Sequence, residues 1–385
     1  MINIDNDDLF PDVLIKVLGV GGGGGNAVET MIKNKLSKVE FIVANTDLSD
    51  LKNSSAKIKV QIGKKVTRGR GAGTNPEKGR LAAEESEDEI KKILQGANLL
   101  ILSAGMGGGT GTGATPVIAK IAQEMNILTL GIVNTPFKHE GVLRNKRAEE
   151  GIIELKKYID TLLIIPNDKL SSIYKQMSLF DAFQKANEVL YQATESIVDI
   201  INTNGAINVD FADVETTLNN KGFALFGIGE SKFEKDSDNK AKAIEAANAA
   251  INNPLLEDIT LSSCKGLLIN VASDFNLGMQ DFDAIMEVIT NEAGGTPNII
   301  QGVVLDEKYK DKIRVSIIAT GLHNEKFEKT DNEDNVSVMK ASSEDDDFKR
   351  IKMNTQQKST RIEPDYPKID NENYDVPAFA RKVID

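Results

Sequence analysis

The residues of this sequence that are best suited to chemistry are glycines, which gather in three clusters, each before a segment expected to be helical. The first cluster spans residues 19–26 (GVGGGGGN) and follows the apolar run 13–20. Glycines let the backbone approach an anion closely, and the free N–H groups of a helix N-terminus attract negative charge. Read alone, this cluster also fits a dinucleotide-binding fingerprint in which Asp47 would hold a ribose. A tight turn that binds no ligand would have the same sequence pattern.

The other two clusters favour a phosphate-binding crevice over a single dinucleotide turn. Residues 67–76 (TRGRGAGTNP) lead into a helix that starts at Pro76, and residues 103–113 (SAGMGGGTGTG) lie between a strand and a helix. The latter offer backbone N–H groups and two threonine hydroxyls in one concave turn, which suits a di- or triphosphate. A dinucleotide domain needs only one such loop, so three loops predict one crevice to which all contribute. A P-loop is excluded, because the only glycine–lysine pair is followed by Lys65.

Two pairs of residues spaced four apart are candidates for holding the rest of a nucleotide. Glu140 and Arg144 follow the strand-like run 127–134 and would share one helix face, although the same spacing is typical of a surface ion pair. Phe183 and Asn187 lie on an expected long helix. There Phe183 could stack on a base while Asn187 hydrogen-bonds its edge, or Phe183 could be a core residue.

A last group of candidates, Asn208, Asp210 and Asp213, lies in the sequence NVDFAD. Asx residues that follow a helix usually form caps and turns. A carboxylate pair can instead polarise a water molecule or hold a cation. The spacing leaves both interpretations open.

Composition excludes several other classes of protein. The 385 residues carry 58 acidic and 46 basic side chains, for a net charge of −12, which disfavours nucleic acid as a partner. One cysteine and two histidines argue against a disulfide framework, a cysteine metal cluster and a histidine-rich metal site. No apolar run approaches the length of a membrane span, and the N-terminus (MINIDNDDLF) is acidic rather than signal-like, which predicts a cytoplasmic protein.

The elements that would position these residues alternate along the first part of the chain. Strand-like runs at 13–20, 41–45, 98–103, 127–134 and 161–166 alternate with helix-like segments at 27–35, 76–94, 114–125 and 141–158. This order predicts a parallel sheet with helices on both faces and a binding crevice at the C-terminal ends of the strands. Residues 179–203 lack glycine and proline and predict one long helix joining two domains, and residues 222–320 predict a mixed sheet.

The C-terminal segment has a different character. Residues 323–374 contain no glycine and are rich in charge and poor in apolar side chains, which is typical of a disordered linker. In the last eleven residues (DVPAFARKVID), Val376, Phe379 and Val383 recur at helical spacing, with Pro377 suited to a first turn. This pattern predicts a peptide that folds into a partner's groove, with a frayed terminus as the alternative.

Together these motifs resemble the FtsZ family of tubulin-like bacterial cell-division GTPases. The resemblance rests on GGGGGN at 21–26, NTD at 45–47, GAGTNP at 71–76, GGGTGTG at 107–113, TPFKHEG at 135–141 with Arg144, PND at 166–168 and NVDFAD at 208–213. It implies an α/β, tubulin/FtsZ-like fold. The implied domains are a flexible N-terminus (1–12), a GTP-binding domain on a parallel sheet (13–178), a central helix (179–203), a catalytic loop and linker (204–221), a smaller C-terminal α/β domain (222–322), a disordered charged linker (323–374) and a partner-binding peptide (375–385).

The resemblance also implies roles for individual residues, with glycines around the phosphates, Glu140 and Arg144 at the sugar–phosphate part, and Phe183 with Asn187 at the guanine. The implied GTP-binding residues are Gly22, Gly23, Gly24, Gly25, Asn26, Asn45, Gly71, Ala72, Gly73, Gly107, Gly108, Gly109, Thr110, Gly111, Thr112, Glu140, Arg144, Asn167, Phe183 and Asn187. The implied catalytic residues, which would reach into the nucleotide pocket of the next subunit, are Asp210, Asp213 and Asn208. The implied partner-binding residues are Val376, Pro377, Phe379, Arg381 and Lys382.

The implied activity is hydrolysis of GTP to GDP and phosphate within head-to-tail filaments that form the division ring at mid-cell. Mg²⁺ would be held by the phosphates and water rather than by protein side chains, and division proteins such as FtsA would bind the C-terminal peptide, so that the membrane is reached only through partners. Guanine specificity rests on the resemblance, because Asn187 could serve either purine. A Rossmann-type oxidoreductase is the alternative, weakened by the additional phosphate loops and the few histidines, and a nucleotide-gated adaptor with very slow hydrolysis is a third hypothesis.

Overall fold

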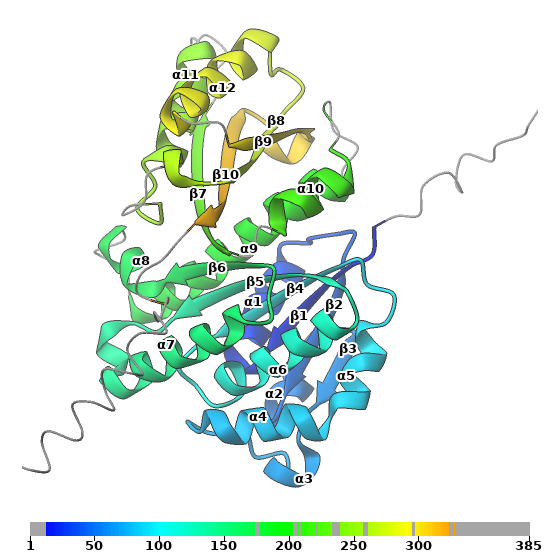
Figure 1. Ribbon diagram of the computed structural model, residues 1–385. Helices are drawn as coiled ribbons and strands as arrows, with labels where there is room; N and C mark the ends of the chain where they lie inside the picture. Colours follow the sequence, from blue (N-terminus) through cyan, green and yellow to red (C-terminus); the bar gives the residue numbers. More distant parts are fainter. Residues whose placement is uncertain are drawn as a thin grey trace, which may run out of the picture. The chain divides into compact units, whose positions relative to one another are not determined.

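A single sheet runs through both halves of the chain in the computed structural model (Figure 1). The structure describes residues 13–173, 178–202, 207, 209–219, 222–232, 239–256, 261–294, 297–322 and 327, and the statements below refer to these residues. The elements of the first half are β1 (Ile15–Val20), α1 (Gly21–Lys33), β2 (Glu40–Asn45), α2 (Leu48–Asn53), β3 (Ile58–Gln61), α3 (Lys64–Thr67), α4 (Pro76–Glu85), α5 (Glu87–Leu94), β4 (Leu99–Gly105), α6 (Thr110–Glu124), β5 (Leu128–Thr135), α7 (Val142–Lys156), β6 (Thr161–Pro166) and α8 (Asn167–Ile173).

The long helix α9 (Leu179–Asn202) lies between the two halves. The elements of the second half are α10 (Phe211–Leu218), β7 (Gly222–Lys232), α11 (Asn239–Ile251), β8 (Gly266–Ser273), α12 (Met279–Ala293), β9 (Asn298–Leu305) and β10 (Lys312–Leu322). Three short 3₁₀ turns lie at Lys138–Glu140, Leu261–Ser263 and Glu307–Tyr309.

The sheet has ten strands in the order β3-β2-β1-β4-β5-β6-β7-β10-β8-β9. Strands β1 to β6 pair in parallel, as their alternation with helices predicts. The second half is mixed, because β8 and β9 are parallel while β10 is antiparallel to both β7 and β8. The predicted fold class is therefore confirmed, and the structure adds a direct link between the halves. Strand β6 pairs in parallel with β7, from Thr161↔Gly222 to Leu163↔Ala224.

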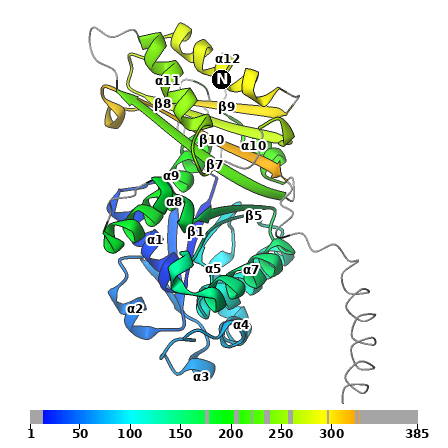
Figure 2. The same cartoon turned by 90° about the vertical axis from the view of Figure 1, so that its left-hand side faces the viewer.

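Helices cover both faces of this sheet (Figures 1 and 2). Helices α1, α2, α8, α9 and α10 contribute to the core on one face, and α4, α5, α6, α7, α11 and α12 to the core on the other. Strand β1 serves both cores, because Ile15 and Val17 pack toward α1 and α9 whereas Leu18 and Val20 pack toward the opposite layer. A strand buried on both sides is continuously apolar, which is why the parallel strands are recognisable in the sequence.

The start of α1 differs from the prediction. The helix begins at Gly21 rather than at residue 27, so the glycine run forms its first turns instead of a preceding loop. Glycine is a poor helix former, and local propensity therefore gives no sign of this start. Packing explains it, because a Cβ atom at Gly24 would collide with the carbonyl oxygen of Ser103 on β4, and one at Gly19 with the Gly24 carbonyl. Only glycines let α1 lie this close to the sheet.

The helix predicted over residues 76–94 is also different, because it is divided into α4 and α5. The division lies at Ser86, whose hydroxyl accepts a hydrogen bond from the backbone N–H of Gly63 at 3.0 Å. Five helices and strands were not predicted at all, namely α2, β3, α3, α8 and α10, which contain between four and eight residues each. Such short segments hold too few periods for a hydrophobic pattern to be recognised.

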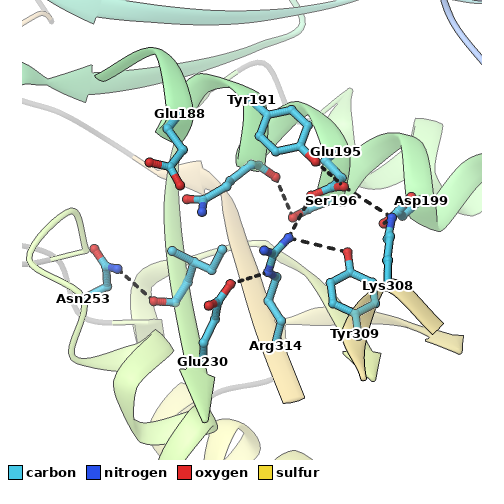
Figure 3. A network of polar contacts seen from close by, with 12 residues as sticks. Glu188, Tyr191, Glu195, Ser196, Asp199, Glu230, Asn253, Lys308, Tyr309 and Arg314 are labelled. Atoms are coloured by element: carbon cyan, nitrogen blue, oxygen red, sulfur yellow. Dashed lines mark hydrogen bonds and ion pairs between the residues drawn. The ribbon is translucent and has the colours of Figure 1, made fainter. Parts of the chain in front are cut away.

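Helix α9 matches the predicted long helix over 179–203 and is tied to the second half of the chain by a cluster of charged groups (Figure 3). We call this cluster the α9–β10 junction, formed by Tyr191, Glu195, Asp199, Glu230, Lys308, Tyr309 and Arg314. The Glu195 carboxylate, on a residue that is 4% exposed, accepts hydrogen bonds from the Tyr191 hydroxyl at 2.5 Å and from Arg314 Nη1 at 2.7 Å. Burial raises the pKa of Asp199 to about 6, although Lys308 Nζ lies 3.6 Å from its carboxylate.

Candidate functional site

The three glycine clusters lie together at the C-terminal ends of the parallel strands, as the topology requires. The backbone N–H of Gly109 donates to the carbonyl oxygen of Gly73 at 2.9 Å, which joins the second cluster to the third. A Cβ atom on Gly21 would lie 3.0 Å from the backbone nitrogen of Gly111, which brings the first cluster against the third. The N-terminal turns of α1 and α6 therefore meet at one place, and both supply free N–H donors there.

The first cluster divides its glycines between packing and exposure. Gly21 and Gly24 are buried, and Gly25 is half-buried against the Val43 side chain. Gly22 and Gly23, together with Asn26, are exposed on the first turns of α1. The exposed turn is the part of this cluster that a ligand can reach.

The third cluster forms the turn before α6. Gly107 has φ +94° and donates its N–H to the hydroxyl of Thr112 at 2.8 Å, so this hydroxyl is used within the loop. The hydroxyls of Thr110 and Thr46 share a hydrogen bond at 2.7 Å. The two threonine hydroxyls that were predicted to contact the phosphates, those of Thr110 and Thr112, are thus already hydrogen-bonded within the protein. Gly108 is the open position, since no atom lies within 4 Å of where its Cβ would be.

Asn45 and the second cluster are held by the protein itself. Asn45 is 3% exposed; its Nδ2 donates to Asp50 at 3.0 Å and its Oδ1 accepts from the N–H of Asp47. The Gly71 N–H donates to a backbone carbonyl at 3.2 Å, and Ala72 is 5% exposed. These contacts fix the shape of the two loops behind the crevice.

Asp47, which a dinucleotide site would direct at a ribose, has a different role in this structure. Its carboxylate accepts the N–H of Ser49 at 2.8 Å and caps α2. The residue also forms an isolated β-bridge with Arg70. The structure thus gives Asp47 a local explanation that needs no ribose.

A cavity of about 230 Å³ opens beside the exposed turn of α1. Its lining combines seven of the predicted residues with five that were not predicted. The predicted ones are Gly23, Asn26, Glu140, Arg144, Asn167, Phe183 and Asn187, and the others are Gly105, Met106, Asn134, Thr135 and Pro136. The missed residues follow or end β4 and β5, so their position at the strand ends is the signal that could have found them.

The outer wall of this cavity holds a charged pair and an aromatic pair. Glu140 and Arg144, four residues apart, form an ion pair at 3.0 Å. The Glu140 side chain is 12% exposed and also accepts the N–H of Phe137 at 2.8 Å, which fixes the carboxylate. The Phe183 ring stands edge-on to the buried Phe137 ring with centroids 5.2 Å apart, and Phe183 itself remains 39% exposed. An exposed aromatic face next to Asn187 is suited to stacking on a planar base.

The predicted catalytic carboxylates lie elsewhere. Asp210 precedes α10 as its N-cap residue and Asp213 lies in its first turn, and both are exposed. Neither belongs to the residues that line the cavity. Asn208 lies outside the described residues, as do Val376, Pro377, Phe379, Arg381 and Lys382.

A larger hollow of about 400 Å³ lies on another side of α6, between α4 and α7. Its walls carry several charged side chains, among which Arg80 pairs with Glu77 and Glu84 at 2.5 Å each. Thr112 is the only predicted site residue among those that line it. Size alone therefore does not identify the site, and the convergence of strand ends and helix N-termini does.

Two further findings concern metals and membranes. Among the described residues, no three His, Cys, Asp or Glu side chains are grouped so that they could hold a metal ion. Within the same part of the chain, every helix is too short or too polar to cross a bilayer.

Comparison with known proteins gives concordant results for both halves. Residues 14–175 match the family model "Tubulin/FtsZ family, GTPase domain", and residues 222–323 match "FtsZ family, C-terminal domain". The chain is 42% identical over 392 residues to the cell division protein FtsZ of Buchnera aphidicola subsp. Baizongia pistaciae, covering 97% of this chain and 98% of the relative. It is 45% identical over 309 residues to the Coxiella burnetii protein of that name, covering 80% and 78%. A solved M. jannaschii FtsZ dimer superimposes with a TM-score of 0.75 at 39% identity, covering 81% of this chain and 89% of that one.

Proposed function

Because the chain belongs to the FtsZ family of cell-division proteins and carries its tubulin-like GTPase domain, we propose that it assembles head to tail and hydrolyses GTP between adjacent subunits. The filaments would form the division ring at mid-cell in the cytoplasm. The observation that carries this proposal is the separation of two exposed half-sites, the glycine-lined cavity and the α10 carboxylates. The M. jannaschii relative is described as a dimer, which supports self-association of this chain.

We assign the phosphates of GTP to the meeting point of the α1 and α6 N-termini. The exposed turn at Gly22 and Gly23 and the open Gly108 would donate backbone N–H groups, aided by both helix dipoles. The buried and half-buried members of the predicted set would act indirectly, by keeping the loops in shape. They are Gly24, Gly25, Asn45, Gly71, Ala72, Gly107, Gly109, Thr110, Gly111 and Thr112. Gly73 is exposed, but its carbonyl oxygen accepts the Gly109 N–H and so helps in the same way.

We assign the nucleoside to the cavity. Glu140 would accept hydrogen bonds from ribose hydroxyls, and Arg144 would approach the sugar–phosphate part. Guanine would stack on the exposed face of Phe183, with the amides of Asn187, Asn26 and Asn167 at its edge. No lysine is needed near the phosphates, which suits a chain whose net charge is −12.

Hydrolysis would require the next subunit. Asp210 and Asp213, with Asn208, would reach the γ-phosphate of the neighbouring molecule, orient a water molecule and accept its proton. A contact between two different surfaces does not close on itself, so repetition produces a filament. Assembly and catalysis would then be one event.

Mg²⁺ fits this site as an ion held chiefly by the nucleotide. Magnesium commonly keeps several waters and binds through phosphates and one or two carboxylates, so a protein cage is unnecessary. Asp50 is a carboxylate in the right region, 3.5 Å from where a Gly22 Cβ would lie, although Asn45 already bonds it. When bound, the ion would offset the negative charge of the phosphates. We further propose that the C-terminal peptide recruits division proteins such as FtsA, which would link the filament to the membrane.

The shared active site can be tested by mixing two inactive variants. Asp213→Ala should bind GTP and fail to hydrolyse it, and Gly22→Asp should fail to bind GTP because a carboxylate then faces the phosphates. A mixture should regain GTPase activity, since the Gly22→Asp subunit still offers Asp213 to a GTP-loaded neighbour. Phosphate release measured with GTP and Mg²⁺ should also rise per molecule with protein concentration in the unmodified chain.

Two results would contradict the proposal. A turnover per molecule independent of concentration would mean that one subunit contains the whole active site. A mixture as inactive as its components, with both variants folded by circular dichroism, would exclude Asp213 as the residue supplied by the neighbour.

A further inference from the structure

Asn134 lies on the floor of the cavity and has no role in the function proposed above. It stands near the end of β5, where the register places it beside Gly105 of β4 and Ile165 of β6. Because parallel strands end at the same edge, the next residues of β6 bring Asn167 close to it. The two asparagines line one cavity.

The amide groups of the two asparagines are in contact. Nδ2 of Asn134 donates to Oδ1 of Asn167 at 3.4 Å, and Asn167 is 2% exposed. With its oxygen engaged by Asn134, Asn167 has its NH₂ group left to offer to a ligand. The direction of the Asn134 amide therefore decides whether Asn167 meets the cavity as a donor or as an acceptor.

The oxygen atom of the Asn134 amide suggests that this residue is kept for function rather than for stability. Its Oδ1 is buried and has no hydrogen-bond partner among the described residues, and it lies 3.3 Å from where a Gly105 Cβ would be. A buried acceptor without a partner lowers stability, and an apolar side chain at this position would avoid that cost. A buried polar group that lowers stability needs another explanation, and a role in function is one.

From these contacts we propose that Asn134 is a positioning residue that sets the polarity of Asn167 and so selects a 6-keto purine over a 6-amino purine. The proposal rests on the function proposed above, in which the cavity holds the base. An NH₂ group from Asn167 can donate to the O6 atom of guanine, whereas it would face the amino group of adenine. This gives the chain a physical reason for preferring GTP that Asn187 alone does not provide.

The test reverses the polarity with Asn134→Asp. A carboxylate can only accept, so Asn167 must turn its NH₂ toward residue 134 and present its oxygen to the cavity. We expect the affinity ratio of GTP to ATP to fall by about tenfold or more, because a mismatched polar group in a buried site is strongly rejected. The ratio of GTP to 2-aminopurine riboside triphosphate, which lacks O6, should fall with it. Competition against a fluorescent GTP analogue on the full chain measures both ratios, in which a general effect of the added charge cancels.

Asn134→Leu is the second variant, and it keeps the test valid if the aspartate variant does not fold. Leucine removes the constraint on Asn167 and should also lower the GTP to ATP ratio, by less than aspartate does. A merely structural role for Asn134 would weaken GTP and ATP equally, so ratios unchanged within twofold in the folded variants would overturn the proposal. An unmodified chain that binds GTP no better than ATP would overturn the proposed function as well, which separates the two failures.

Discussion

The nucleotide crevice and the α9–β10 junction differ in how they use charged side chains. The crevice would receive a highly charged ligand, yet its inner surface is made of backbone amides, glycines and neutral side chains, with one ion pair at its rim. The junction instead joins five charged side chains between α9 and the second half of the chain, and two of them, Glu195 and Asp199, are almost fully buried. In the junction, charged side chains thus connect parts of the chain to one another, whereas in the crevice the backbone dipoles would bind the anion.

This difference has a physical basis in solvation. A backbone N–H at a helix N-terminus is neutral and already points outward, so it can bind a phosphate without moving or changing its protonation state. A buried carboxylate needs a permanent partner, because removing water from an ion costs several kcal/mol. The three predictions below test this contrast, from the largest expected effect to the smallest.

Replacing Arg314 by methionine should cause the largest loss of stability. The change leaves Glu195, which is 4% exposed, without its closest cation, and breaking a buried pair in this way typically costs about 3–5 kcal/mol. Urea denaturation measures the loss. The double variant Glu195→Gln with Arg314→Met should recover part of it, because the buried charge of Glu195 is then removed, and Glu230, which also loses Arg314, is exposed to solvent. A loss below about 1 kcal/mol in the single variant would mean that the junction is not a stabilising feature.

Replacing Gly24 by alanine should destabilise the crevice through shape alone. The new methyl group would collide with the Ser103 carbonyl, and overpacking of this kind costs about 1–3 kcal/mol or more. Gly22→Ala is the matched control in the same helix, since its Cβ meets only Asp50 at 3.5 Å and alanine is the better helix former. Thermal unfolding should show a lower midpoint for the first variant and an unchanged or higher one for the second. Equal behaviour would refute the division of these glycines into packing and exposed positions.

Replacing Asp199 by asparagine should increase stability, by an amount that depends on pH. Burial raises the pKa of Asp199 to about 6 from a usual 3.8, so its ionised form opposes folding at pH values above 6. The gain should be full at pH 7, about 1–3 kcal/mol, and should shrink as the pH falls from 6 toward 4, where the natural carboxyl is protonated in the folded state. Denaturant midpoints at several pH values, with the exposed Asp283→Asn as control, measure this trend. A gain in stability that grows toward low pH would contradict this prediction.

Much of this arrangement was predictable from the sequence, for identifiable reasons. The three glycine clusters are local signals, and parallel topology then requires that loops at strand ends meet. The sequence placed Glu140 and Arg144 on one helix face, and their 3.0 Å contact is observed. Glu140, however, lies in the 3₁₀ turn before α7 rather than on the helix, because Gly141 separates the two elements. The predicted roles of these residues in binding GTP stay predictions.

Other features depended on contacts that no local pattern reveals. The start of α1 at Gly21 is set by the approach of Gly24 to β4, and the division of α4 from α5 at Ser86 by a hydrogen bond to a residue far away in the sequence. Asn134 was not predicted as a site residue, because a single asparagine at a strand end resembles any turn residue. Only the register of β5 with β6 places it beside Asn167.

The pairing of β6 with β7 has a mechanical consequence for such a molecule. Backbone hydrogen bonds between residues 161–163 and 222–224 connect the nucleotide-binding sheet to the other half in parallel with α9. A pull on one half therefore reaches the other through two links, a stiff helix and a short strip of sheet. If the subunits assemble as proposed, both links would carry tension within each subunit.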